Sequence, residues 1–327
     1  MRAASFRKFG PASDIFEFAD VPTPTPQAGE VLVRLHASGI NPLDVKFRAG
    51  GRGPLGGDIA IPHYDGAGVI EAVGDGVDGG RVGERVWVFE GRTGRAWGTA
   101  AEYSAIESWR AVPLGEAMSF AEGACLGIPA VTAWLSIAAG GDLAGKDVLV
   151  TGGAGSVGSY AIQFAKRQGA RVIATVSSEE KAAQARGDGA DETVNYRSGD
   201  TAEAIRALTG GKGVDHISEV ELGGNMPVTV KILKPGATVA AYASMAVPEA
   251  PVPFYPFLRT APSFHIIACF VPPRAARQAT ATAIGASIAQ AGLTTHIAGT
   301  WTLGDIVAAH EAVESGTLRG NAVITID

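Results

Sequence analysis

The chain has 327 residues, of which 46% are hydrophobic and 18% are charged. This length and composition fit a globular α/β protein of about two domains, each with its own core. The net charge of −6 comes without a long run of Lys or Arg, which argues against nucleic acid or an anionic membrane as the binding partner.

The amino-terminal residues indicate a first strand rather than a targeting signal. Arg2, Arg7 and Lys8 interrupt the apolar residues, whereas a secretory signal needs a continuous apolar core. The longest strongly apolar stretch, 264–271, is too short to cross a bilayer. The two cysteines cannot form a disulfide framework. We therefore expect a soluble, cytoplasmic protein.

Short strands separated by glycine and proline turns are typical of the chain up to about residue 122. Residues 30–38 alternate between apolar and other side chains, and 68–73 and 85–89 are further strand candidates. This spacing predicts a compact, partly open β-barrel. The proline-rich segment 21–30 is interpreted as an extended connector, with a proline-rich recognition ligand as the alternative.

A short apolar run leads into a glycine cluster at residues 148–158, VLVTGGAGSVG. The run suits a buried parallel strand, and a helix with one apolar face is expected over 156–168. The cluster contains G-x-G-x-x-G at Gly153, Gly155 and Gly158. Glycines let backbone N–H groups approach a pyrophosphate, whose charge the positive end of the helix favours. Strand, turn and helix in this order predict dinucleotide binding, with a purely structural turn as the alternative.

Strands and helices alternate from residue 143 onward. The strand candidates after the glycine turn are 171–176, 192–194, 215–220, 237–242 and 264–270. Their alternation with helices predicts a doubly wound parallel sheet. A helix over 274–291 follows, and a last strand over 322–326 is expected to return to the first domain.

The end of the second strand of this sheet determines which dinucleotide fits. An acidic residue there would bind the ribose 2′-hydroxyl of NAD, whereas a 2′-phosphate needs donors and positive charge. Ser177 and Ser178 occupy the place, and Lys181 follows one turn later, which favours NADPH. Glu179 and Glu180 would repel a phosphate if they pointed inward, and Ser177 with Glu180 also matches a helix-capping box.

Several segments resemble the medium-chain dehydrogenase/reductase superfamily. They are SGINPLDVKFRAG (38–50), DGAGVIEAVGDGV (65–77), GERVW (83–87), LGIPAVTAW (126–134), the glycine turn and NYR (195–197). They occur in collinear order, and within the superfamily the chain looks most like zeta-crystallin-type NADPH:quinone oxidoreductases. The resemblance implies a GroES-like catalytic domain, 1–122 and 272–327, a Rossmann cofactor domain, 123–271, an active site in the cleft, and a homodimer.

The resemblance also assigns site residues. Asn41 and Asp44 would lie near the nicotinamide and the substrate, and Tyr64 is a candidate proton donor, with a packed strand tyrosine as the alternative. Gly155 to Val157 would hold the pyrophosphate. The full set implied for the cofactor is Asn41, Thr132, Gly153, Gly155, Ser156, Val157, Gly158, Ser177, Ser178, Lys181, Tyr196, Ser244, Phe270, Val271 and Asn321.

The chain departs from the family at four charged positions. Lys46 and Arg52 replace frequent tyrosines, which puts quinone stacking in doubt and favours an anionic or carbonyl-bearing substrate unless both are solvated surface residues. Glu219 and Glu221 stand where relatives usually have an apolar segment with one Asp.

The positions of a catalytic zinc look empty, although many relatives are zinc alcohol dehydrogenases. Such a site needs about three protein ligands. Asn41 replaces the usual cysteine, Tyr64 replaces the histidine, and Asp65 takes the place of a glutamate. His63 lies one residue too early, so its ring should point to the other side. We therefore expect no metal.

Without metal, the expected chemistry is hydride delivery with electrostatic help from the protein. The sequence predicts an NADPH-dependent reductase of a quinone, and the alternative acceptor is an α,β-unsaturated carbonyl such as an enal, enone or enoyl thioester. The Asn41 amide is the candidate donor, and Asp44, taken as an ordinary ionised carboxylate, is a network residue. A non-enzyme alternative is an NADPH-binding crystallin-like or RNA-binding protein.

Overall fold

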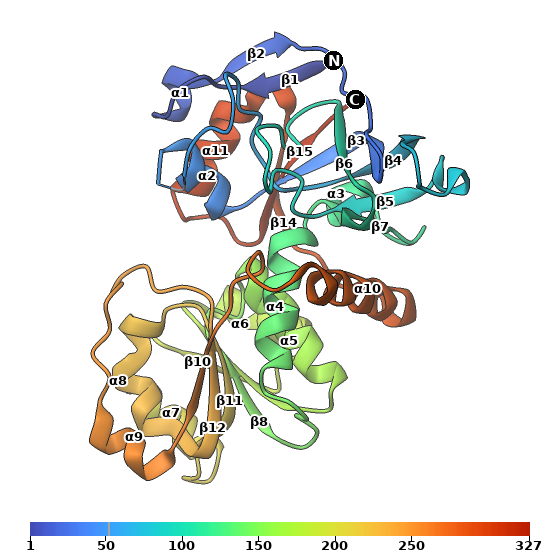
Figure 1. The fold of residues 1–327 in the computed structure, drawn as a ribbon. Helices are drawn as coiled ribbons and strands as arrows, with labels where there is room; N and C mark the ends of the chain where they lie inside the picture. Colours follow the sequence, from blue (N-terminus) through green and yellow to red (C-terminus); the bar gives the residue numbers. More distant parts are fainter. Residues whose placement is uncertain (52) are drawn as a thin grey trace. The chain divides into compact units, whose positions relative to one another are not determined.

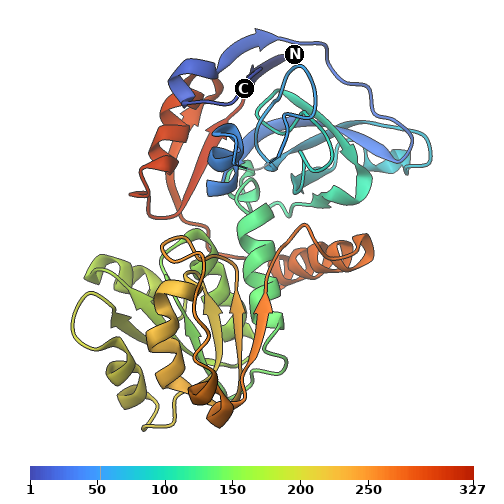
Figure 2. The same cartoon turned by 60° about the vertical axis from the view of Figure 1, so that its left-hand side comes forward.

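The computed structural model describes residues 1–51 and 53–327, which divide into two compact units. The barrel unit comprises Met1–Ile128 and Pro272–Asp327, and the sheet unit comprises Pro129–Val271 (Figures 1 and 2). Arg52, one of the two unexpected cations, lies outside the described residues. Within the described ranges, no helix combines the length and the apolar character that crossing a bilayer requires.

The barrel unit is built on a seven-stranded sheet in which the carboxyl-terminal strand pairs with a strand from the amino-terminal part of the chain. Its order is β14 (Ile297–Thr302), β15 (Asn321–Thr325), β3 (Glu30–Ile40), β4 (Asp65–Val73), β5 (Arg85–Val88) and β7 (Ala111–Pro113), and β6 (Tyr103–Glu107) pairs with β3. A separate hairpin joins β1 (Arg2–Ser5) to β2 (Glu17–Asp20). The carboxyl-terminal β15 runs antiparallel to β3, so the tail belongs to this unit.

Five α-helices of the barrel unit accompany this sheet among the described residues. They are α1 (Ala12–Ile15), α2 (Pro42–Arg48), α3 (Phe120–Gly123), α10 (Arg274–Ala291) and α11 (Ile306–Glu314), with short 3₁₀ turns at Gly79–Arg81, Ser108–Arg110 and Leu303–Asp305. Helix α2 follows β3 directly, with Asn41 as its N-cap and Pro42 as its first residue, a position that tolerates proline. The sequence therefore places Asn41 and Asp44 on one tight strand-to-helix turn.

The sheet unit contains the predicted doubly wound parallel sheet. Its order is β10 (Glu192–Asn195), β9 (Arg171–Val176), β8 (Asp147–Val150), β11 (Val214–Glu219), β12 (Leu233–Ala241) and β13 (Ser263–Ile266). The helices are α5 (Ser156–Arg167), α6 (Glu179–Gly187), α7 (Thr201–Leu208), α8 (Leu222–Ile232) and α9 (Phe254–Thr260), and α4 (Gly127–Ala138) contains the boundary between the units. In Figure 1, α7 and α8 lie on one side of the sheet and α4 and α5 on the other. The α/β fold class is confirmed.

Strand β13 ends earlier than the apolar run 264–270 predicts. Its last residue, Ile266, pairs with Ala241, where β12 also ends. All four residues of β13 are exposed. A strand continues only as far as its neighbour supplies hydrogen bonds, and an apolar run alone does not encode that limit.

Candidate functional site

The glycine turn has the geometry of an anion-binding helix start. Strand β8 ends at Val150, and Gly155 is the N-cap of α5 without a side-chain hydrogen bond to the first turn. The first N–H groups of α5, at Ser156 and Val157, are therefore not capped by this residue and suit a pyrophosphate. At Gly158, a Cβ atom would come within 2.3 Å of the Gly152 carbonyl oxygen, so the close packing of turn and helix requires glycine there.

A buried carboxyl fixes the start of this turn. Glu219 is 0% exposed, and its Oε1 accepts hydrogen bonds from the Thr151 hydroxyl at 2.8 Å, the Asn225 amide at 2.7 Å and the Glu221 N–H at 2.7 Å. Burial raises the pKa of this carboxyl above its ordinary value. Glu219 thereby links the end of β11 to the first residue of the glycine turn and to α8.

The second unexpected acid, Glu221, holds the segment after β12. Its carboxylate accepts backbone N–H groups from Met245 at 2.6 Å and Ala246 at 3.0 Å, and it caps α8 at Gly224. Burial acts to raise the pKa of this carboxyl, but the backbone hydrogen bonds outweigh burial and the pKa is lowered. The Ser244 hydroxyl completes the loop by donating to the Val247 carbonyl at 2.6 Å. Sequence reasoning singled out both acids but assigned neither a role.

The residues predicted to determine whether NADPH or NADH binds follow two adjacent strands of the sheet, β9 and β10. Ser178, not Ser177, is the N-cap of α6, and its hydroxyl accepts the Lys181 N–H at 3.3 Å, so the predicted capping box at Ser177 is wrong by one residue. The Tyr196 N–H donates to the Val176 carbonyl at 3.0 Å, which places Tyr196 beside the end of β9. Glu179 forms an ion pair with Arg186, which offsets its charge.

The remaining predicted cofactor residues are distributed over both units. Thr132 is buried in α4, and Phe270 and Val271 follow β13, with the Val271 side chain 78% exposed. Asn321 begins β15 in the barrel unit, and its amide donates to the His296 carbonyl at 3.1 Å. The glycine turn and the residues predicted to bind a 2′-phosphate thus belong to the sheet unit, while Asn41 and Asn321 belong to the barrel unit.

Two buried carboxyls surround Asn41 in the barrel unit. The Asn41 N–H donates to Asp44 Oδ2 at 2.7 Å, and the Asn41 amide donates to Asp65 Oδ2 at 2.8 Å. Asp65 Oδ2 also accepts the Ile128 N–H at 2.7 Å. Burial raises the pKa of Asp44 to about 7 and that of Asp65 well above its ordinary value. Asp44 is therefore not the ordinary ionised carboxylate that the sequence suggests, although it does belong to a network.

Tyr64 and His63 are neighbours in the chain but have separate surroundings. The Tyr64 hydroxyl accepts a hydrogen bond from Arg92 Nη1 at 3.0 Å. The His63 ring lies in the interior, with Nδ1 2.8 Å from the Ser38 hydroxyl and Nε2 2.9 Å from His310 Nε2. Over residues 1–51 and 53–327, no group of three or more His, Cys, Asp or Glu side chains could hold a metal ion.

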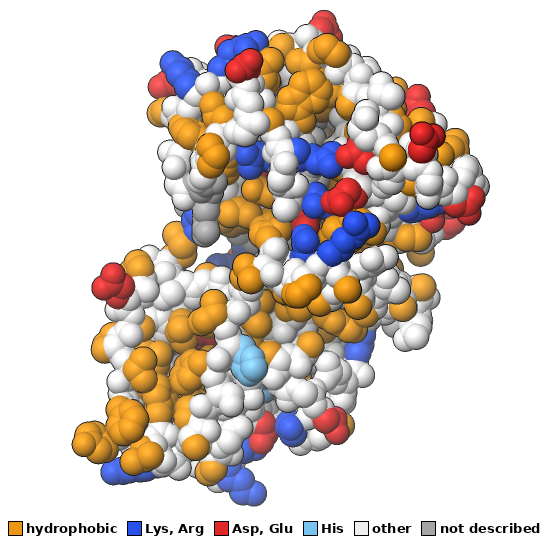
Figure 3. All heavy atoms as spheres, viewed as in Figure 1, with side chains coloured by type: hydrophobic (Ala, Val, Ile, Leu, Met, Phe, Trp, Pro, Cys, Tyr) orange, Lys and Arg blue, Asp and Glu red, His pale blue; other side chains and the backbone are white. Residues whose placement is uncertain are grey.

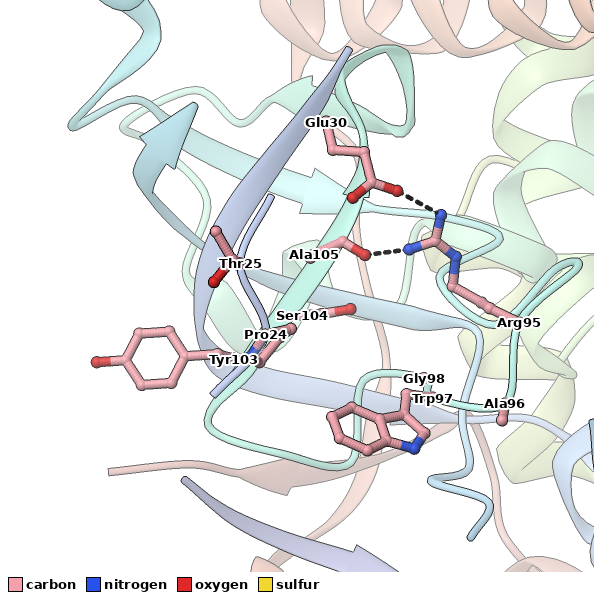
Figure 4. A pocket seen from close by; sticks show the side chains of 10 residues that line it. All are labelled: Pro24, Thr25, Glu30, Arg95, Ala96, Trp97, Gly98, Tyr103, Ser104 and Ala105. Carbon is pink, nitrogen blue, oxygen red and sulfur yellow. Dashed lines mark hydrogen bonds and ion pairs between the residues drawn. The ribbon is translucent and has the colours of Figure 1, made fainter. Parts of the chain in front are cut away.

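The barrel unit also contains a cavity of about 240 Å³ that sequence reasoning did not find (Figure 4). Arg95 lies at its edge, bonded to Glu30 at 2.9 Å and to the Ala105 carbonyl. Its lining residues are Pro24, Thr25, Glu30, Arg95, Ala96, Trp97, Gly98, Tyr103, Ser104 and Ala105. None of these is a predicted site residue.

Comparison with known proteins agrees with this two-unit arrangement. Residues 27–116 match a family model described as alcohol dehydrogenase GroES-like domain, and residues 156–284 match one described as zinc-binding dehydrogenase. A quinone oxidoreductase from Rattus norvegicus is 35% identical over 240 residues, 73% of this chain and 72% of that protein. A 2-haloacrylate reductase from a Burkholderia species is 36% identical over 245 residues, 74% of this chain and 72% of that protein.

Solved structures extend the likeness to the whole chain. A structure titled NAD-dependent alcohol dehydrogenase is 30% identical with a TM-score of 0.89, and each chain is covered to 100%. A mycobacterial protein solved with NADPH is 26% identical with a TM-score of 0.85, again with 100% of both chains covered. The fold and these relatives therefore define a class of two-domain oxidoreductases. The chain belongs to the medium-chain dehydrogenase/reductase superfamily, with quinone oxidoreductases among its relatives.

Proposed function

We propose that this protein is a zinc-independent, NADPH-dependent reductase that transfers hydride to a quinone. The observation that supports this most is the hydrogen bond between Asn41 and Asp65, because these side chains occupy expected zinc-ligand positions and bind each other. An amide, a phenol and a buried carboxyl do not form a zinc site of the usual donor types. These three residues therefore support a reductase that works without a catalytic zinc.

The alternative acceptor is an α,β-unsaturated carbonyl compound. The relatives include a 2-haloacrylate reductase and, at 31% identity, a 2-methylene-furan-3-one reductase from Solanum lycopersicum, both named for conjugated substrates. Lys46, half-buried in α2, replaces a frequent aromatic residue and favours this acceptor class over a stacked quinone. The non-enzyme alternative, a crystallin-like or RNA-binding protein, is disfavoured for RNA by the net charge of −6.

The chain supplies binding and electrostatic stabilisation in this proposal, and bound NADPH supplies the hydride. Backbone N–H groups at Gly155 to Val157 hold the pyrophosphate. The 2′-phosphate site is formed by Ser177, Ser178, Lys181 and Tyr196. The nicotinamide side is lined by Thr132, Ser244, Phe270, Val271 and Asn321. Asn41 uses one amide N–H for Asp65, and its second N–H stabilises the oxyanion that develops on the acceptor.

We also propose that the protein is a cytoplasmic homodimer. Strand β13 is an edge strand of its sheet, with Ile266 74% exposed. Hydrophobic side chains gather over the nearby helix α9, where Phe254, Tyr255 and Leu258 are exposed (Figure 3). An open edge beside apolar surface suits pairing with the same edge of a second copy.

Replacement of Asn41 tests the proposed function. We expect Asn41→Ala to lower kcat for NADPH-dependent reduction of a small quinone by about a hundredfold, the typical effect of losing one oxyanion donor. The dissociation constant of NADPH should change little, since the interaction forms mainly in the transition state. The matched control is Gln27→Ala, which removes an exposed amide from the same unit. Unchanged kcat in Asn41→Ala would contradict the proposal.

A further inference from the structure

Arg92 is a nearly buried cation in direct contact with a phenol. The residue is 6% exposed, and its guanidinium carbon lies 3.2 Å from the centroid of the Phe47 ring. Nη1 donates to the Tyr64 hydroxyl at 3.0 Å, and Nη2 donates to the Leu55 carbonyl at 3.4 Å. Both acceptors are uncharged, so the arrangement is not a salt bridge that merely neutralises the guanidinium.

The burial of Arg92 indicates whether its charge binds a substrate directly or stabilises the phenolate of Tyr64. A guanidinium that binds an anionic substrate must be reachable, whereas Arg92 is packed against Phe47 and Tyr64. A guanidinium that donates to a phenol oxygen stabilises the phenolate, and this effect is stronger away from water. Burial lowers the pKa of Arg92, but an arginine side chain stays protonated near neutral pH. Its charge therefore acts on the Tyr64 hydroxyl, to which it donates a hydrogen bond, and by Coulombic attraction on the Asp44 carboxyl.

Among residues 1–51 and 53–327, the two carboxyls of the Asn41 network also lie close to Tyr64. Asp44 on α2 accepts the Tyr64 backbone N–H, and Asp65 is the next residue in the chain. Ionised carboxylates would oppose loss of the phenol proton. Burial raises the pKa of both carboxyls, to about 7 for Asp44, so their negative charge is reduced at neutral pH while that of Arg92 persists.

We propose that Arg92 is a positioning residue that makes Tyr64 the proton donor of the reduction, an inference that rests on the proposed hydride transfer. With an enone, hydride forms a new bond at Cβ, and the electrons of the C=C bond move toward the carbonyl oxygen. The Tyr64 O–H bond then breaks, and its proton goes to Cα. With a quinone, the proton goes to the quinol oxygen. The phenolate is stabilised by Arg92 and recovers a proton from water, so the acceptor gains one hydride and one proton.

Titration of the phenol tests the contact between Arg92 and Tyr64 without any substrate. The ultraviolet absorbance of ionised tyrosine is followed against pH, and the Tyr64 signal is isolated by subtracting the Tyr64→Phe variant. We expect Tyr64 to ionise about one pH unit or more higher in Arg92→Gln than in the wild type, because an adjacent opposite charge shifts a pKa by this amount. Arg92→Lys, which keeps the charge, should fall between them. Ionisation at the same pH in wild type and Arg92→Gln would overturn the proposal.

Steady-state kinetics then test whether the contact serves catalysis. Tyr64→Phe and Arg92→Gln should each lower kcat about a hundredfold with little change in KM, and the double variant should be no slower than Tyr64→Phe alone. Equal losses from Arg92→Gln in the wild-type and Tyr64→Phe backgrounds would refute a role through Tyr64. If Arg92→Gln does not fold by circular dichroism, Arg92→Lys replaces it in both experiments. Failure of the wild type to reduce any acceptor would contradict the proposed function. The phenol titration needs no acceptor, so it would still show whether Arg92 shifts the ionisation of Tyr64.

Discussion

Lys181 is the one cation among the side chains predicted to meet the cofactor 2′-phosphate. It lies half-buried in the first turn of α6, where its N–H bonds to the capping hydroxyl of Ser178. Glu179, the nearest acid in the chain to that cap, is engaged with Arg186. We therefore propose that single side chains at the start of this helix determine whether NADPH or NADH binds.

We expect Lys181→Ala to weaken NADPH binding about tenfold to a hundredfold, the usual worth of one charge-assisted contact, and to leave NADH binding nearly unchanged. Fluorescence titration of both cofactors measures this. The matched control is Lys212→Ala, which removes an exposed lysine of the same unit. Equal affinity of the wild type for NADPH and NADH would contradict the assignment.

Residue contacts could be predicted from the sequence only where they are local. The turn that holds Asn41 and Asp44 spans four residues and follows from capping preferences. The bonds from Arg92 to Tyr64 and from Met245 to Glu221 join residues far apart in the sequence. Only the fold brings such pairs together, and no spacing pattern within one chain encodes them. The sequence shows Glu221 as a departure from the family, but it does not show which N–H groups this carboxylate accepts.

At the scale of elements, a hydrogen bond between two buried histidines joins α11 to the segment before β4. His63 Nε2 lies 2.9 Å from His310 Nε2, and one ring must donate while the other accepts, so the accepting ring is neutral. Burial lowers the pKa of His63 to about 3 and that of His310 well below its ordinary value. Protonation of the accepting ring would break this hydrogen bond between α11 and the segment before β4.

This pair makes the barrel unit sensitive to acid. Since the folded-state pKa values are depressed, protons bind the unfolded chain first, and stability is lost as the pH falls below about 6.5. One such histidine lowers the free energy of unfolding by about 2 kcal/mol when the pH falls from about 7 to about 5. Asp44 and Asp65, with raised pKa values, act in the opposite direction over this range, so the comparison must be made between variants.

We expect the loss of unfolding free energy from about pH 7 to pH 5 to be smaller in His310→Gln than in the wild type by about 2 kcal/mol, the contribution of one buried neutral histidine. Urea unfolding followed by tryptophan fluorescence measures the difference. Four of the five tryptophans lie in the barrel unit, so the signal reports mainly on it. The same pH-dependent loss in both proteins would show that His310 is not held neutral.

Helices and strands with a clear apolar pattern in the sequence could be predicted, whereas elements whose position depends on tertiary contacts could not. The strand at 171–176 and the helix at 274–291 have the bounds that their sequences predict. Strand β14 and helix α11 were missed. Every residue of β14 is partly or fully exposed, so it lacks an apolar run, and its position follows from pairing with β15. Pairing partners distant in the chain decide such elements.

At the scale of the whole molecule, each unit carries one part of the proposed chemistry. The sheet unit provides the glycine turn and the 2′-phosphate residues, and the barrel unit provides Asn41, Asp44, Tyr64 and Arg92. The relatives differ in the acceptors for which they are named, which include quinones and conjugated carbonyl compounds. We propose that the barrel unit activates such acceptors without zinc.

A panel of acceptors, measured by NADPH oxidation before and after treatment with a strong chelator, tests this claim most directly. The panel contains small quinones, enones or enals, and the corresponding saturated ketones and aldehydes, and the zinc content of the purified protein is determined alongside. We expect turnover with quinones or enones, little turnover with the saturated compounds, no stoichiometric zinc, and no loss of rate in chelator. About one zinc per chain with chelator-sensitive turnover, or reduction of the saturated carbonyls alone, would contradict this proposal.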